Sequence, residues 1–116
     1  MTPGQKYIVL KDALYTLKNH VGYIYKIKLS DQCFDYVAGK YWTIQNIEQA
    51  MIQIELSDKS SQAQWLALIT YICKQHEHVI KCQHDPSHNG RIFVLNALLT
   101  TINTLEKENS YDKKII

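Results

Sequence analysis

The sequence predicts a mainly α protein with one small β-hairpin, an α+β class. Two patterns support this prediction. Apolar residues recur at three- and four-residue steps in four segments, as they do along the buried faces of helices. A turn-rich segment, DPSHNG at 85–90, lies between two short apolar runs, as expected of a hairpin. With 116 residues, 46% of them hydrophobic, the chain is expected to form one domain, over 1–107, with a flexible tail at 108–116.

The first predicted helix extends from Lys6 to Val21. Thr2 and Pro3 precede it, and both residue types suit a helix start. Its apolar face is formed by Tyr7, Leu10, Leu14, Leu17 and Val21. Gly22 is expected to end it. For the segment GYIYKIKLS at 22–30, alternation of apolar and polar residues favours a short strand, and a continuing helix is the alternative.

Two further helices are predicted in the middle of the chain. Thr43 is a candidate N-cap for one whose apolar face is Ile44, Ile47, Met51 and Ile54. SDKSS at 57–61 then supplies a turn and further N-cap residues. The next helix is expected to end near 76–78, with an inward face made of Trp65, Leu66, Ile69, Ile72 and Cys73.

The hairpin is predicted over 78–95. Val79 and Ile80 begin the first strand because β-branched residues favour strands. Asp85 and Pro86 favour a turn, and Gly90 is expected to supply a positive φ. The return strand is 92–95, and a last helix follows from Ala97 to about Lys107, with the apolar face Leu98, Ile102 and Leu105.

The segment from Tyr41 to Leu95 resembles the winged helix-turn-helix of MarR-type transcription regulators. WTIQNIEQAM looks like the first helix of that motif, SSQAQWLALITYICK like the recognition helix, and VIKCQHDPSHNGRIFVL like the wing. The resemblance implies a recognition helix in the major groove, a wing arginine in the minor groove, and end helices that build a homodimer. Asn89 departs from the pattern, because the family often has an acidic residue there to brace the wing arginine.

The resemblance places DNA contacts on the recognition helix and on the wing. Serine and glutamine can reach phosphates and adenine edges, and lysine and arginine can reach phosphates and the minor groove. The candidates are Lys59, Ser61, Gln62, Gln64, Lys81, His88 and Arg91. Each has a structural alternative: in that case Gln62 and Gln64 form the solvated first turn of a helix, and Arg91 only pairs with Asp85 across the turn.

No cofactor is expected for the DNA-binding hypothesis, but cysteine and histidine residues suggest a zinc site as an alternative. Cys73 and His76 share a face on a helix, and Cys82 and His84 share a face on a strand. Two cysteines and two histidines suit tetrahedral zinc, with His88 as a substitute for His84. The spacing matches no zinc signature, and free cysteine is also common as a small buried apolar residue.

These patterns lead to one functional hypothesis and one alternative. The first is a small homodimeric regulator of transcription that binds double-stranded DNA, as the resemblance implies. A cytoplasmic location without membrane binding is expected, because the chain has an odd number of cysteines, no signal peptide and no long apolar run. The alternative is a non-catalytic protein-interaction module, an adaptor or an inhibitor of the kind found on mobile elements. The small net charge of +2 permits both. Catalysis is not expected, because nothing orients a pair of Cys82 with a histidine.

Overall fold

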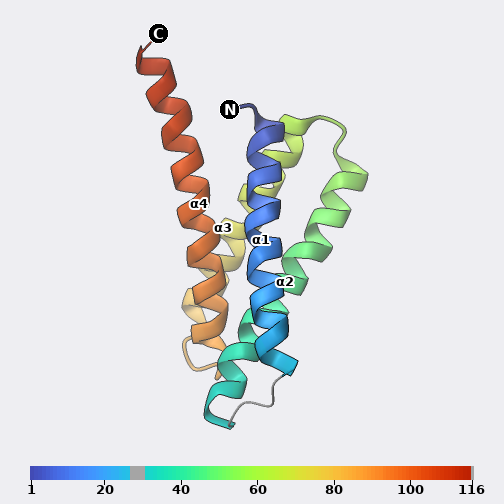
Figure 1. Ribbon diagram of the computed structural model, residues 1–116, viewed down its shortest axis with the longest axis vertical. Helices are drawn as coiled ribbons and strands as arrows, with labels where there is room; N and C mark the ends of the chain where they lie inside the picture. The colour runs from blue at the N-terminus through green and yellow to red at the C-terminus, as the bar shows by residue number, and fades with distance from the viewer. Residues whose placement is uncertain (27–30, 116) are drawn as a thin grey trace.

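The described part of the chain forms a bundle of four helices that alternate in direction (Figure 1). The computed structural model describes the backbone of 1–26 and 31–115 and the side chains of 1–21 and 34–107. The helices are α1 (Pro3–Lys26), α2 (Asp31–Ser57), α3 (Ser61–Lys81) and α4 (His88–Ile115). Each helix packs against the other three, and the molecule extends over 53 × 30 × 26 Å.

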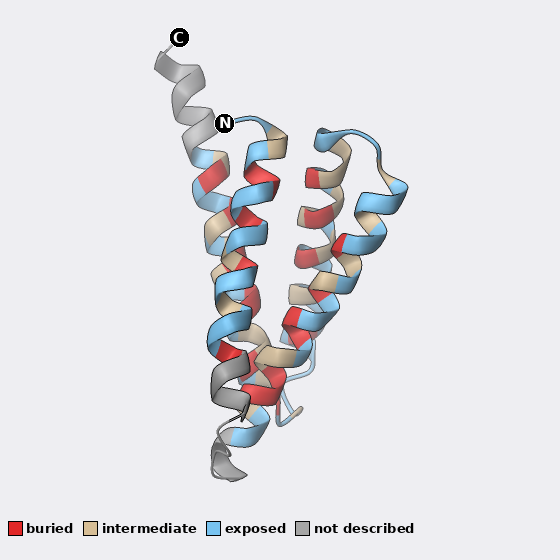
Figure 2. Ribbon diagram, turned by 45° about the vertical axis from the view of Figure 1, so that its right-hand side comes forward, coloured by how far each residue is buried: buried red, intermediate tan, exposed pale blue. Residues whose placement is uncertain are grey.

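The core is a single apolar cluster to which all four helices contribute. Most of the predicted apolar faces are buried, in line with the inward stripes visible in Figure 2. The largest side chains that are fully enclosed are Leu10, Val21, Ile44, Ile47, Leu68, Ile72, Val94, Leu95 and Leu98. Burying one such side chain stabilises the fold by roughly 1.5–3 kcal/mol, so this cluster supplies most of the driving force.

Local capping fixes where two of the helices begin. At α1, the N–H of Gln5 donates to Thr2 Oγ1 at 3.2 Å, and the N–H of Thr2 donates to Gln5 Oε1 at 2.9 Å. This reciprocal pair is a capping box. At α3, Ser60 is the N-cap, and its hydroxyl oxygen accepts from the N–H of Ala63 at 3.1 Å. The expectation that Thr2 and Pro3 start the first helix is confirmed, although α1 begins at Pro3 and not at Lys6. The N-cap residues expected within 57–61 are also confirmed, by Ser60.

Polar side chains join the helices around the core. Glu106 on α4 accepts a hydrogen bond from the indole N–H of Trp65 at 2.8 Å and pairs with the buried Lys6 at 3.4 Å. Glu55 on α2 accepts from the hydroxyl of Tyr7 at 3.2 Å. Because these groups meet only in one axial alignment, they fix the register of the helices.

The predicted hairpin, and with it the α+β class, is wrong. Val79 and Ile80 continue α3, and 92–95 belong to α4; no strand occurs in the described backbone. Val94 and Leu95 lie on the same buried face as Leu98, Ile102 and Leu105, so the helical spacing of α4 begins before Ala97. Without a wing, the resemblance to MarR-type regulators does not hold. The turn itself is confirmed, but it joins two helices.

Gly90 does not supply a positive φ; it allows α2 and α4 to touch. A Cβ on Gly90 would collide with the carbonyl oxygen of Tyr36 and lie 3.0 Å from the backbone N of Lys40. A Cβ on Gly39 would collide in the same way with the carbonyl oxygen of Ser87. The two glycines therefore form a close crossing at the lower end of the bundle, where the backbones of α2 and α4 are in contact.

Smaller differences follow from helices that are longer than expected. Gly22 lies within α1, which rules out the strand for 22–26, whereas 27–30 lie outside the described residues. Thr43 is buried inside α2 and caps nothing, because α2 begins at Asp31. Leu66 and Cys73 are exposed rather than inward-facing, and Leu68 takes the buried position. The expected tail at 108–116 lies outside the described side chains.

Candidate functional site

The predicted DNA contacts fall at opposite ends of α3. Lys59, Ser61 and Gln62 are exposed where α3 begins, and the side-chain N–H of Gln64 there donates to the carbonyl of Asp58 at 2.9 Å. The other three candidates, Lys81, His88 and Arg91, lie where α3 ends and α4 begins. A helix of 21 residues is roughly 30 Å long, so the two groups do not form one contact surface.

Arg91 is held by the loop between α3 and α4. Its Nε donates to the hydroxyl of Ser87 at 2.9 Å, and its guanidinium lies 3.8 Å from Asp85. Asp85 in turn accepts from the hydroxyl of Ser87 at 2.6 Å and from its backbone N–H at 2.8 Å. These hydrogen bonds from Ser87, with a smaller contribution from Arg91, hold the pKa of Asp85 below its usual value. The predicted alternative of an Asp85–Arg91 pair across the turn is confirmed.

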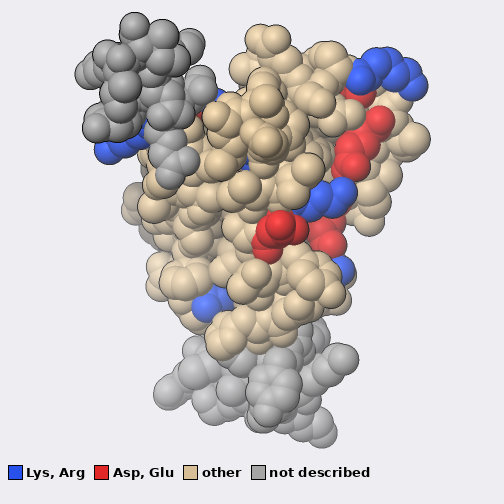
Figure 3. Space-filling model, turned by 45° about the horizontal axis from the view of Figure 1, so that its top comes forward, with Lys and Arg blue, Asp and Glu red and all other residues tan. Residues whose placement is uncertain are grey.

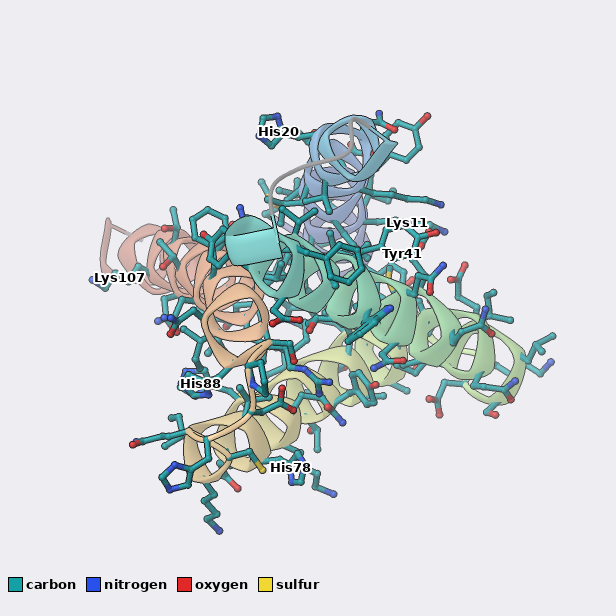
Figure 4. All side chains as sticks on the ribbon, turned by 90° about the horizontal axis from the view of Figure 1, so that it is seen from below. Lys11, His20, Tyr41, His78, His88 and Lys107 are labelled. Carbon is teal, nitrogen blue, oxygen red and sulfur yellow. The ribbon has the colours of Figure 1, made fainter. Side chains whose placement is uncertain are left out.

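His88 opens α4 beside this network. It is half-buried, and its Nδ1 is enclosed without a hydrogen-bond partner among the described residues. Figure 4 shows His88 at the start of α4 and His78 near the end of α3, at the same end of the bundle. His88 therefore packs into the fold and does not project as a wing tip.

The predicted zinc ligands do not converge. His76 Nε2 lies 3.0 Å from Asn96 Oδ1, and Cys73 is an exposed free cysteine. The Sγ of Cys82 lies 3.8 Å from the Nε2 of a different histidine, His78. No group of three metal-ligating side chains occurs among the described residues. The sequence prediction missed the His78–Cys82 pair because it ended α3 too early; the four-residue spacing places both residues on one face of a helix that reaches Lys81.

An apolar groove lies between α2 and α3. It has a volume of about 570 Å³, and small residues from both helices, Ala50 on α2 and Ala67 on α3, lie in its lining. It is lined by Ala50, Gln53, Ile54, Leu66, Ala67, Thr70, Tyr71 and Lys74. Leu66 is 55% exposed there, although it is a large apolar side chain. Sequence reasoning missed this site, because Leu66 was assigned to the core.

The seam between α1 and α2 has a different character. A smaller hollow of about 160 Å³ lies over it, lined in part by charged side chains. Lys11 pairs with Glu55 at 3.3 Å, and Lys18 pairs with Glu48 at 2.9 Å. Figure 3 shows acidic and basic side chains intermixed along one side of the molecule, beside a wider surface of other residue types. Since the charges neutralise one another in pairs, this seam presents no field of one sign to a charged ligand.

Comparison of the chain with protein-family models, with curated proteins and with solved structures finds no match. Within the described residues, no helix combines the length and the apolar character that a membrane span requires.

Proposed function

We propose that the protein is a non-catalytic interaction module that binds an amphipathic helix of a partner protein in the groove between α2 and α3. The observation that carries this proposal is that the large apolar side chain of Leu66 is exposed in an apolar groove of about 570 Å³. Two neighbouring helices with small residues between them form the type of groove into which a third helix packs.

The groove lining defines the chemistry of the partner. Its polar rim contains Gln53 and Thr70, and its one charged residue is Lys74. A fitting helix has apolar residues at three- and four-residue steps and an acidic residue that faces Lys74. Covering the exposed half of Leu66 contributes about 1 kcal/mol to such a complex, by the usual value for a leucine side chain.

Selection from a display library of amphipathic helical peptides tests this proposal. Peptides enriched on the wild-type protein are measured against Leu66→Asp, which buries a carboxylate in the contact, and against Lys74→Glu. Affinity is expected to fall at least about 10-fold for each. Ile80→Asp is the matched control, because Ile80 is also exposed on α3 but does not line the groove. No enrichment, or equal binding to all variants, contradicts the proposal.

DNA binding remains a separate hypothesis, now without the wing from which it was inferred. Binding to random duplex DNA at about 50 mM salt, with affinity that falls steeply as salt rises, is its direct test. Absence of salt-dependent binding eliminates it and leaves the interaction module as the hypothesis to pursue.

A further inference from the structure

The His78–Cys82 pair has the geometry of half a zinc site. In a tetrahedral site with Zn–S of about 2.3 Å and Zn–N of about 2.0–2.1 Å, a sulfur and a nitrogen ligand are about 3.6 Å apart. The Sγ of Cys82 and the Nε2 of His78 are 3.8 Å apart, so a small side-chain rotation brings both within reach of one ion.

The surroundings of the pair leave it open to an ion. Cys82 is a free cysteine, and both residues are exposed at the last turn of α3. Figure 4 shows His78 on the outer side of α3, away from the other helices. The carbonyl ends of α3 give this end a partial negative charge, which favours a cation, and the flanking charges of Glu77 and Lys81 cancel.

The described residues of one chain supply only two of the four ligands that a closed zinc site requires. No third histidine, cysteine, aspartate or glutamate joins the pair among the described residues. A two-fold axis through the ion brings in an identical pair from a second copy, which completes a Cys₂His₂ set.

We infer that His78 and Cys82 of two copies of this chain bind one Zn²⁺ between them, so that zinc joins the protein into a dimer. Each Cys82 thiol loses its proton to the solvent as its sulfur binds the ion, so two protons are released for each zinc bound. Each His78 binds through a neutral Nε2, with its proton on Nδ1. This inference does not depend on the groove between α2 and α3.

The test starts from full-length protein stripped of metal by a chelator and kept reduced. Zinc chloride is titrated in while mass is measured by light scattering after size exclusion and bound zinc by elemental analysis. The expected result is a doubled mass at one zinc per two chains, reversed by a chelator. Reversal separates this dimer from one joined by a disulfide, which a chelator does not break.

Variants locate the site. His78→Ala and Cys82→Ser are expected to abolish both zinc binding and the doubled mass, because each leaves one ligand per chain. Cys73→Ser and His76→Asn are matched controls on the same helix and are expected to retain both. Cobalt in place of zinc gives a thiolate charge-transfer band in the wild type and Cys73→Ser, but not in Cys82→Ser. A mass unchanged by zinc, one zinc per chain without a dimer, or a dimer that persists in Cys82→Ser overturns the inference.

Discussion

The crossing of α2 and α4 at Gly90 and Gly39 makes a quantitative prediction about a single methyl group. Gly90→Ala places a Cβ against the carbonyl oxygen of Tyr36, at 2.9 Å from the carbonyl carbon and 3.0 Å from the N of Lys40. All three atoms are backbone, so no side-chain rotation can relieve the collision. The two helices must separate, and the packing of the buried Ala38 and Val94 beside the crossing then loosens.

The expected magnitude is the difference between two opposing effects. Alanine favours a helix over glycine by about 1 kcal/mol. Overpacking costs typically about 1–3 kcal/mol, and a backbone contact belongs at or above the upper end of that range. We expect Gly90→Ala to lower the free energy of unfolding by about 2 kcal/mol or more. At about 4 °C per kcal/mol for a chain of this size, the midpoint of thermal unfolding falls by about 8 °C or more.

Urea unfolding followed by circular dichroism measures this change, and Gly4→Ala is the control. Gly4 also lies in the first turn of its helix, but its added Cβ would meet only the exposed side chain of Ser61, at 3.2 and 3.4 Å. That side chain can rotate away, so we expect Gly4→Ala to be neutral or slightly stabilising. If Gly90→Ala is as stable as Gly4→Ala, the backbones of α2 and α4 are not in contact at this point and the reasoning fails.

Three other predictions test the polar contacts. Glu106→Ala leaves the indole N–H of Trp65 and the buried ammonium of Lys6 without their acceptor. It is expected to lower the free energy of unfolding, measured in urea, by about 1–3 kcal/mol. Glu48→Ala, which breaks the exposed Lys18–Glu48 pair, is expected to lower it clearly less. Burial, together with the charge of Glu55, raises the pKa of the Tyr7 hydroxyl well above its usual value, so the folded state holds this proton more tightly than the unfolded state does. The stability that Tyr7 contributes to the folded state is therefore present below about pH 10 and is lost as the pH rises further. Tyr7→Phe should remove that alkaline loss, and an unchanged pH dependence of urea unfolding contradicts the assignment. Ser87→Ala removes the hydroxyl that donates to Asp85 and leaves only the backbone N–H of residue 87 as a donor. Carboxyl NMR titration should therefore show the pKa of Asp85 rising toward its usual value, whereas Ser61→Ala should leave it unchanged.

Periodicity predicted the buried faces better than it predicted the ends of the helices. Tyr7, Leu10 and Leu14 are buried as expected, because a stripe at three- and four-residue steps has a single interpretation over four turns. At 92–95 the same rule was ambiguous, since four adjacent apolar residues suit a strand or a helix. The helical choice becomes evident only when Val94 and Leu95 are taken together with Leu98 and Ile102.

The wrong hairpin also explains why the candidate sites were misplaced. A strand that begins at Val79 places Cys82 on one face with His84, two residues on, whereas a helix places it beside His78, four residues back. Likewise, the sequence does not distinguish a glycine needed for a turn from a glycine needed for close helix packing. The packing role of Gly90 becomes clear only from its contact with the backbone of Tyr36 on α2. Which side chains a candidate metal ligand can meet therefore depends on the period of the backbone, about 3.6 residues in a helix and 2 in a strand. The zinc experiment examines this dependence directly, because a site that requires His78 and not His76 can form only where α3 continues to Lys81, next to Cys82.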